Sequence, residues 1–215
     1  FIPAFPGTNS EYDSLRAFQR AGAIGTIGVF RNRNADDIKE TIKEWTEEIK
    51  NSQIMMIPGG FSAGDEPDGS GKFIAAVFRN PYLSEAVMDL IKNRDGLVLG
   101  VCNGFQALIK LGLLPYGEIK ELDENAPTLT FNRVGRHISQ LQSVRVSSKL
   151  SPWLAYASVG EIFSLPLSHG EGRFVADDLT LADWIKNGQI ASQYVDLAGK
   201  ATYDGTFNAN GSLYA

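Results

Sequence analysis

The chain has 215 residues, of which 43% are hydrophobic and 21% charged, with a formal net charge of -5. This length suits one sizeable α/β domain, or at most two small ones, with one core the first expectation. The acidic balance argues against nucleic acid as a partner, because a phosphate-binding surface needs an excess of Lys and Arg. No apolar run approaches the roughly 20 residues that a membrane-spanning helix needs. The single cysteine excludes an internal disulfide, and the start shows no secretion signal, so we expect a cytoplasmic protein without a membrane partner.

Short apolar runs alternate with longer stretches of helical period through the first half of the chain. Such alternation is typical of βαβ units around a parallel sheet. The first predicted helix has a capping box, with Ser10 as N-cap and Asp13 three residues later. The pattern predicts strands and helices in this order: strand 2–5, helix 10–21, strand 24–30, helix 35–50, strand 54–57, helix 83–93, strand 97–101 and helix 104–113.

The second half of the chain is richer in β pattern and less regular, with strands predicted near residues 129–131, 140–146, 161–167 and 189–195. The chain opens on FIPAFPG, which reads like the second half of a strand, and it stops without a charged tail. We therefore expect residues 1–215 to form a single domain that is part of a longer polypeptide.

The segment LVLGVCNGFQ, residues 97–106, predicts a nucleophile elbow at Cys102. Glycines stand two residues before and two after the cysteine, where a tight strand-to-helix turn needs small residues. The following helix favours thiolate over thiol, and a thiolate suits an amide substrate because it forms a thioester that water cleaves. Alternatively, Cys102 is only a small apolar side chain, as most lone cysteines are.

A candidate base lies in the segment SHGEG, residues 168–172. On an extended segment residues two apart face the same way, so His169 and Glu171 are expected side by side, with the carboxylate orienting the imidazole. His137 is the other histidine and the weaker candidate, because no carboxylate lies within several residues of it. The alternative for His169 and Glu171 is a surface salt pair.

The segment Pro58 to Gly60 ends the predicted strand 54–57, and a polar, glycine-rich loop of residues 61–71 follows it. Open α/β sheets bind ligands at this edge of the strands. Glycine N–H groups there, with the N–H of Asn103, would form an oxyanion hole. The alternative is a tight turn without a chemical role.

Several separated motifs resemble those of a known family. PGGFSAGD (58–65), GVCNGFQ (100–106) and SHGEGRF (168–174), in that order, resemble the glutaminase of class I, or triad, glutamine amidotransferases. PGTNSEYDS near the start, FNRVGRH in the middle and SHGEGRF resemble more narrowly the glutaminase part of formylglycinamide ribonucleotide amidotransferases. Family members often have Cys where this chain has Ser10, and often SGRF where it has residues 134–137.

The resemblance implies a flavodoxin-like α/β fold, a three-layer sandwich with a mostly parallel central sheet and helices on both faces. It implies a catalytic triad that falls on Cys102, His169 and Glu171. It also implies that the backbone of Gly60 and Phe61 contributes to the oxyanion hole.

The resemblance further implies that Gln106 contacts the bound glutamine and that Gly135 and Arg136 line its pocket. In such enzymes ammonia passes to a synthetase domain or subunit, which uses ATP and magnesium to form formylglycinamidine ribonucleotide in purine biosynthesis. We expect no cofactor or metal in this chain, which has no Walker A sequence and carries acidic residues in the glycine-rich GDEPDGSGK.

Two other functions stay open at the level of the sequence. A free-standing cysteine hydrolase, such as a γ-glutamyl hydrolase, would use the same sheet and need no synthetase. A non-catalytic glutamine-sensing module would keep the pocket and lose a triad residue, yet all three residues are present.

Overall fold

The computed structural model describes residues 1–61, 71–212 and 214, so residues 62–70 of the predicted glycine-rich loop lie outside the described part. The chain divides into two compact units, unit 1 (Phe1–Leu122) and unit 2 (Asp123–Ala215). Each unit is described by itself. The single domain predicted for residues 1–215 stays a prediction.

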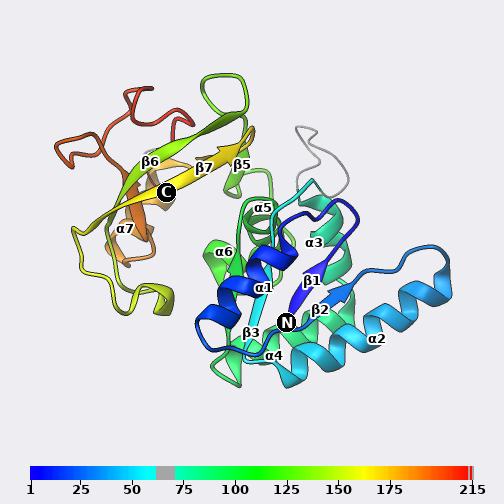
Figure 1. Cartoon of the computed structure of the whole chain (residues 1–215). Coiled ribbons are helices and arrows are strands. Elements are labelled where there is room, and N and C mark those ends of the chain that lie inside the picture. Colours follow the sequence, from blue (N-terminus) through cyan, green and yellow to red (C-terminus); the bar gives the residue numbers. More distant parts are fainter. Residues whose placement is uncertain (62–70, 213, 215) are drawn as a thin grey trace. The chain divides into compact units, whose positions relative to one another are not determined.

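Unit 1 alternates strands and helices, as its periodicity predicts. Its elements are β1 (Ile2–Ala4), α1 (Glu11–Arg20), β2 (Ile27–Val29), α2 (Ala35–Asn51), β3 (Ile54–Ile57), α3 (Lys72–Phe78), α4 (Pro81–Lys92), β4 (Leu97–Gly100), α5 (Asn103–Leu111) and α6 (Leu113–Tyr116) (Figure 1). Most lie within a few residues of the predicted bounds, whereas α3 and α6 have no counterpart among the predictions.

The strands of unit 1 run parallel in the order β2-β1-β3-β4. β1 pairs with β2 and β3 pairs with β4, both in parallel register. Phe1 joins the two pairs, because its terminal amine donates to the carbonyl oxygen of Ile54 at 2.9 Å and its own carbonyl accepts from the N–H of Met56 at 3.0 Å. This is the strand order of flavodoxin-like sheets, in which ligands bind beyond the carboxyl ends of the strands.

Both faces of this sheet are buried. Phe5 and Ile57 belong to a core cluster with apolar residues of α2, α3, α4 and α5. Ala4 and Met56 alternate with them along the strands and are also buried, although they lie outside that cluster. Because successive strand residues point to opposite faces, covering layers are needed on both sides, as predicted.

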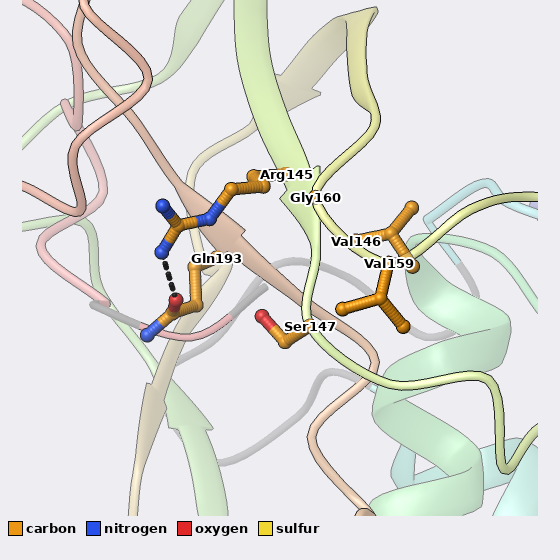
Figure 2. A pocket seen from close by; sticks show the side chains of 6 residues that line it. All are labelled: Arg145, Val146, Ser147, Val159, Gly160 and Gln193. Atoms are coloured by element: carbon orange, nitrogen blue, oxygen red, sulfur yellow. Dashed lines mark hydrogen bonds between the residues drawn. The ribbon is translucent and has the colours of Figure 1, made fainter.

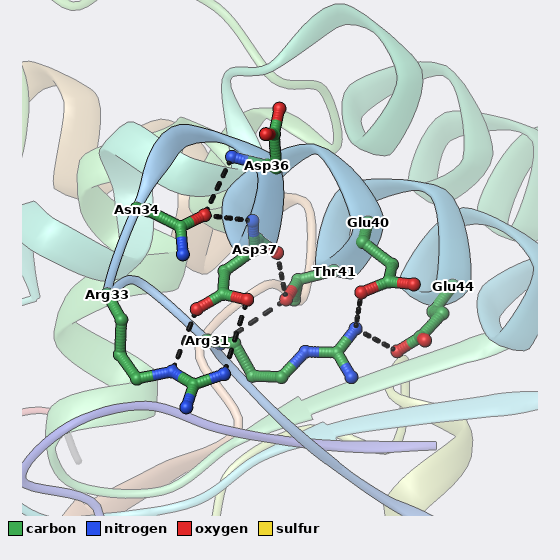
Figure 3. A network of polar contacts seen from close by, with 8 residues as sticks. All are labelled: Arg31, Arg33, Asn34, Asp36, Asp37, Glu40, Thr41 and Glu44. Atoms are coloured by element: carbon green, nitrogen blue, oxygen red, sulfur yellow. Dashed lines mark hydrogen bonds and ion pairs between the residues drawn. The ribbon is translucent and has the colours of Figure 1, made fainter.

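A polar network fixes the start of α2. The side-chain oxygen of Asn34 accepts hydrogen bonds from the N–H groups of Asp36 and Asp37, which makes it a true N-cap. Arg31 pairs with Glu44 at 2.9 Å, next to these caps (Figure 3). Exposed ion pairs contribute less than about 1 kcal/mol each, so the cap is the stronger determinant of where α2 begins.

Unit 2 is built from antiparallel pairs. Its elements are β5 (Thr128–Thr130), β6 (Ile138–Val146), a 3-10 turn (Pro152–Leu154), β7 (Ile162–His169), β8 (Arg173–Val175), α7 (Asp178–Lys186) and β9 (Ser192–Tyr194). β5 pairs with β8, and β6 lies between β7 and β9. The strands predicted in this half are present, whereas β8 and α7 have no counterpart among the predictions.

Candidate active site

Cys102 occupies a strained turn between β4 and α5. β4 ends at Gly100 and α5 begins at Asn103. Cys102 has φ 54° and ψ -112°, a conformation that side chains with a Cβ rarely adopt. The residue is exposed at the amino end of α5, where the helix dipole favours the thiolate. The predicted sharp turn is confirmed.

Two close backbone contacts explain the glycines around Cys102. A Cβ on Gly100 would lie 2.7 Å from the carbonyl oxygen of Gly104. A Cβ on Gly104 would lie 2.0 Å from the carbonyl oxygen of Ile57 in β3. Neither backbone atom can move without shifting its element, so both positions need glycine for α5 to lie this close to the sheet.

The first turn of α5 is buried behind the nucleophile. Asn103 is 2% exposed and Gln106 is 6% exposed. The side-chain nitrogen of Asn103 donates to Oε1 of Gln106 at 3.0 Å. The predicted glutamine contact Gln106 is therefore held in a defined orientation four residues after Cys102.

The turn after β3 lies directly beside Cys102. A Cβ on Gly59 would lie 3.3 Å from the Cβ of Cys102. The Ser10 hydroxyl fixes this turn, because it accepts from the N–H of Gly59 at 2.9 Å and donates to the carbonyl oxygen of Gly59 at 3.2 Å. Ser10 is the N-cap residue of α1, as predicted, but makes no side-chain cap bond, so the predicted capping box is wrong.

The predicted oxyanion-hole residues Gly60 and Phe61 differ in their surroundings. Gly60 has φ 151°, and a Cβ there would lie 2.4 Å from the carbonyl oxygen of Gly7, so only glycine fits. The N–H of Phe61 donates to the same Gly7 oxygen at 2.8 Å. Phe61 would have to break this bond before it could serve an oxyanion.

In unit 2, His169 is the last residue of β7 and pairs with Ile138 of β6. Its Nδ1 is buried and has no hydrogen-bond partner among the described residues. Burial, and repulsion from the neighbouring imidazole of His137, lower the pKa of His169 from 6.5 to about 4. The ring is therefore neutral at pH 7, the state that a general base needs.

Glu171 lies in the bend after β7 and is 5% exposed. The extended backbone predicted for residues 169–171 is wrong, because the strand ends at His169. His169 and Glu171 are therefore not two positions on one face of a strand. Alternation along a strand cannot predict where Glu171 points once the chain has left the ladder.

The other predicted residues of unit 2 lie in a turn before β6. Gly135 has φ 70°, and its N–H donates to the carbonyl oxygen of Asn132 at 2.9 Å. Gly135, Arg136 and His137 are exposed, and Nε2 of His137 lies 3.0 Å from the hydroxyl of Ser168. The predicted triad is thus divided between the units, with Cys102 in unit 1.

A separate cavity of about 290 Å³ lies in unit 2, lined by Arg145, Val146, Ser147, Val159, Gly160 and Gln193 (Figure 2). Arg145 pairs with Ile162, at the opposite end of the β6–β7 ladder from His169. Its guanidinium already donates to Gln193 and to the carbonyl oxygen of Gly199, each at 2.8 Å. No predicted site residue lines this cavity.

Within ranges 1–61 and 71–212 and residue 214, no group of three His, Cys, Asp or Glu side chains could hold a metal ion. In the same part of the chain, the helices are too short or too polar for one to cross a membrane.

A parallel sheet of flavodoxin order, with a strained cysteine between its fourth strand and a helix, defines a class of α/β proteins that present a cysteine nucleophile. The model of the CobB/CobQ-like glutamine amidotransferase domain family matches residues 1–215. The chain therefore belongs to the CobB/CobQ-like glutamine amidotransferase family.

Named relatives agree with this membership, and a solved structure agrees with the fold. The chain is 35% identical over 221 residues to "Phosphoribosylformylglycinamidine synthase subunit PurQ" of Treponema denticola, covering 96% of this chain and 76% of that protein. The protein of the same name from Rubrobacter xylanophilus is 31% identical over 199 residues, covering 91% and 74%. The structure of PurLQS from Thermotoga maritima matches with a TM-score of 0.66 at 23% identity, covering 98% of this chain and 76% of that one. This likeness confirms the predicted α/β fold.

Proposed function

We propose that this chain is a glutaminase that hydrolyses glutamine to glutamate and ammonia through a thioester on Cys102. The ammonia passes to an ATP-dependent synthetase that forms formylglycinamidine ribonucleotide in purine biosynthesis. The observation that carries the proposal is the strained, exposed cysteine at the amino end of α5, in a chain about one-third identical to PurQ subunits.

Acylation begins with neutral His169, which takes the thiol proton. The Cys102 thiolate then attacks the side-chain carbonyl carbon of glutamine, forming a C–S bond and placing an electron pair on the amide oxygen. The N–H groups of Gly60 and Asn103 stabilise this oxyanion. When the intermediate collapses, the C–N bond breaks and the imidazolium of His169 protonates the leaving nitrogen, which departs as ammonia.

Deacylation uses the same base. His169 takes a proton from water as the water oxygen attacks the thioester carbonyl carbon. The C–S bond then breaks with its electron pair on the sulfur of Cys102, the imidazolium returns the proton to that sulfur, and glutamate leaves. In this assignment Glu171 orients the imidazole and stabilises its charged form. Gln106, Gly135 and Arg136 hold the glutamine.

The synthetase supplies the remaining chemistry. ATP and magnesium belong to that partner, and the glutaminase itself needs no cofactor. We place both proteins in the cytoplasm, the compartment predicted from the sequence.

The test is glutamine-dependent product formation by the Cys102→Ala variant with the cognate synthetase present. Glutamate release should disappear, whereas added ammonium chloride should restore the synthetase product, which serves as the control for an intact complex.

Because Cys102 is the only cysteine, a glutamine analogue with an electrophilic diazoketone should add one adduct per chain, at this residue. Undiminished glutamate release by Cys102→Ala would refute the proposal. Equal hydrolysis of γ-glutamyl peptides without a synthetase would favour the free-standing hydrolase instead.

A further inference from the structure

One buried side chain, that of Asn132, bonds to both ends of the loop that follows β7. Asn132 is 2% exposed. Its Nδ2 donates to the carbonyl oxygen of His169 at 2.7 Å and to that of Arg136 at 3.0 Å, while its Oδ1 accepts from the N–H of Gly172 at 3.3 Å. Its main-chain N–H donates to the carbonyl oxygen of Gly170 at 2.9 Å. A single residue thus binds three of the four residues 169–172.

The loop depends on these bonds, because the strand ladder does not reach it. The β6–β7 pairing ends where Ile138 meets His169, and β8 begins only at Arg173. The His169 ring lies against Gly172, where a Cβ would come within 2.2 to 2.5 Å of three ring atoms. The position of the Gly172 backbone therefore decides where the ring can lie.

A second buried asparagine, Asn210, supports the loop through the carbonyl group of Gly172. Asn210 is 1% exposed, and its Nδ2 donates to the carbonyl oxygen of Gly172 at 3.1 Å and to the hydroxyl of Tyr194 at 2.9 Å. Gly172 is thus held at its N–H by Asn132 and at its carbonyl by Asn210. Only a carboxamide offers the two donors and one acceptor that Asn132 uses at once.

We propose that Asn132 is a positioning residue that clamps the 169–172 loop and so fixes the imidazole of His169 against Gly172. The clamp rests on the contacts within unit 2. Its catalytic consequence rests on the proposed function, in which His169 is the base.

The first measurement is the pH titration of the His169 imidazole, followed by NMR in the whole 215-residue chain. Asn132→Leu removes every side-chain bond without adding charge, and Asn208→Leu is the matched control. Asn208 is also 2% exposed, but its side chain bonds to Thr202, Gly211 and Ser212 and not to the loop. The chain has two histidines, so a His137→Gln spectrum assigns the His169 imidazole signal by NMR.

In the wild type the His169 signal should titrate near pH 4, since burial and the charge of His137 hold its pKa down. In Asn132→Leu the freed ring gains water, so its midpoint should rise by at least one pH unit. Asn208→Leu should leave the midpoint unchanged. If Asn132→Leu does not fold, Asn132→Ser, which cannot reach both carbonyl groups, should shift the midpoint in the same direction by less.

The second readout is glutamine hydrolysis with the synthetase present. Asn132→Leu should lower kcat about 10- to 100-fold, whereas alkylation of Cys102 by iodoacetamide should keep its rate. An unmoved His169 titration in both Asn132 variants overturns the clamp, whatever the activity. If the His169 midpoint moves in the Asn132 variants but the wild type releases no glutamate from glutamine, the clamp is supported and the proposed function is refuted.

Discussion

The hydroxyl of Ser10 is the side-chain group that most directly supports the turn beside the nucleophile. Its two bonds both go to Gly59, at 2.9 and 3.2 Å, and Gly59 lies against Cys102. Ser10→Ala removes both bonds, so we expect about 1 kcal/mol lower stability and kcat lower by about tenfold, because the adjacent oxyanion turn loosens.

Urea unfolding and glutaminase kinetics with the synthetase measure these two effects. Ser52→Ala is the control, because it also loses a hydroxyl bond to the main chain, that to Glu48 at 2.7 Å, at the end of α2. It should lower stability comparably and leave kcat unchanged. Equal kcat values for Ser10→Ala and Ser52→Ala would remove Ser10 from the site.

His169 should make stability depend on pH. Its folded pKa is lowered to about 4 from 6.5, so the unfolded chain binds a proton that the folded chain excludes as pH falls through this window. The free energy of unfolding is therefore unaffected by this group above pH 6.5 and falls as the pH drops from 6.5 toward 4. The loss should be on the order of 1 kcal/mol, less than the full shift implies, because water still reaches part of the ring.

Denaturant titrations at pH 7.5, 6 and 5 test this linkage in the wild type and in His169→Gln. Other groups also titrate, so the informative quantity is the difference between the two proteins. The wild type should lose more stability than the variant on acidification. Parallel pH profiles would mean that the imidazole keeps an ordinary pKa in the folded chain.

Single residues also mark the limit of what the sequence predicts. Ser10 was predicted as an N-cap, and its position at the start of α1 is correct. Its hydroxyl instead bonds 49 residues away, and no local spacing reveals such a contact. Asn132 gave no signal as a support of His169, because a buried carboxamide resembles an exposed one in sequence.

At the scale of elements, the contact between α5 and β3 is the tightest constraint on the elbow. Gly104→Ala would put a Cβ 2.0 Å from the carbonyl oxygen of Ile57 and push the helix away from the strand. We expect a loss of about 2–4 kcal/mol, measured by urea unfolding, and loss of glutaminase activity. Gly205→Ala is the control, since nothing lies within 4 Å of its added Cβ, and it should change stability by less than about 0.5 kcal/mol.

The predicted bounds agree with the structure for elements with a clear hydrophobic periodicity, whereas elements that depend on distant partners were missed. The apolar steps from Ile38 to Ile49 placed α2 within one residue, and the run 54–57 placed β3 at its observed bounds. β8 is three residues long and exists through its pairing with β5, more than 40 residues earlier. β5 is equally short and was predicted, so length alone does not decide; β8 begins on the charged Arg173 and offers only Phe174 and Val175 as an apolar pattern.

At the scale of the whole molecule, the proposed chemistry draws on both units. The thiolate character of Cys102 depends on α5 within unit 1, while the proposed base lies on the loop after β7 in unit 2. The sequence suggested this combination only through the order of its motifs, because no spacing links residues 102 and 169. Reactivity of the thiol and turnover of glutamine are therefore expected to depend on different parts of the chain.

This separation leads to a prediction for His169→Ala. Alkylation of Cys102 by iodoacetamide should keep its rate within about tenfold, because the helix dipole still stabilises the thiolate. Glutamine turnover with the synthetase should fall about 10²- to 10⁴-fold, because both acylation and deacylation lose their base. His137→Ala, which removes the other histidine, should change both rates by less than about twofold. If His137→Ala instead abolished turnover and His169→Ala did not, the base would have to be reassigned to His137, the candidate that the sequence ranked second.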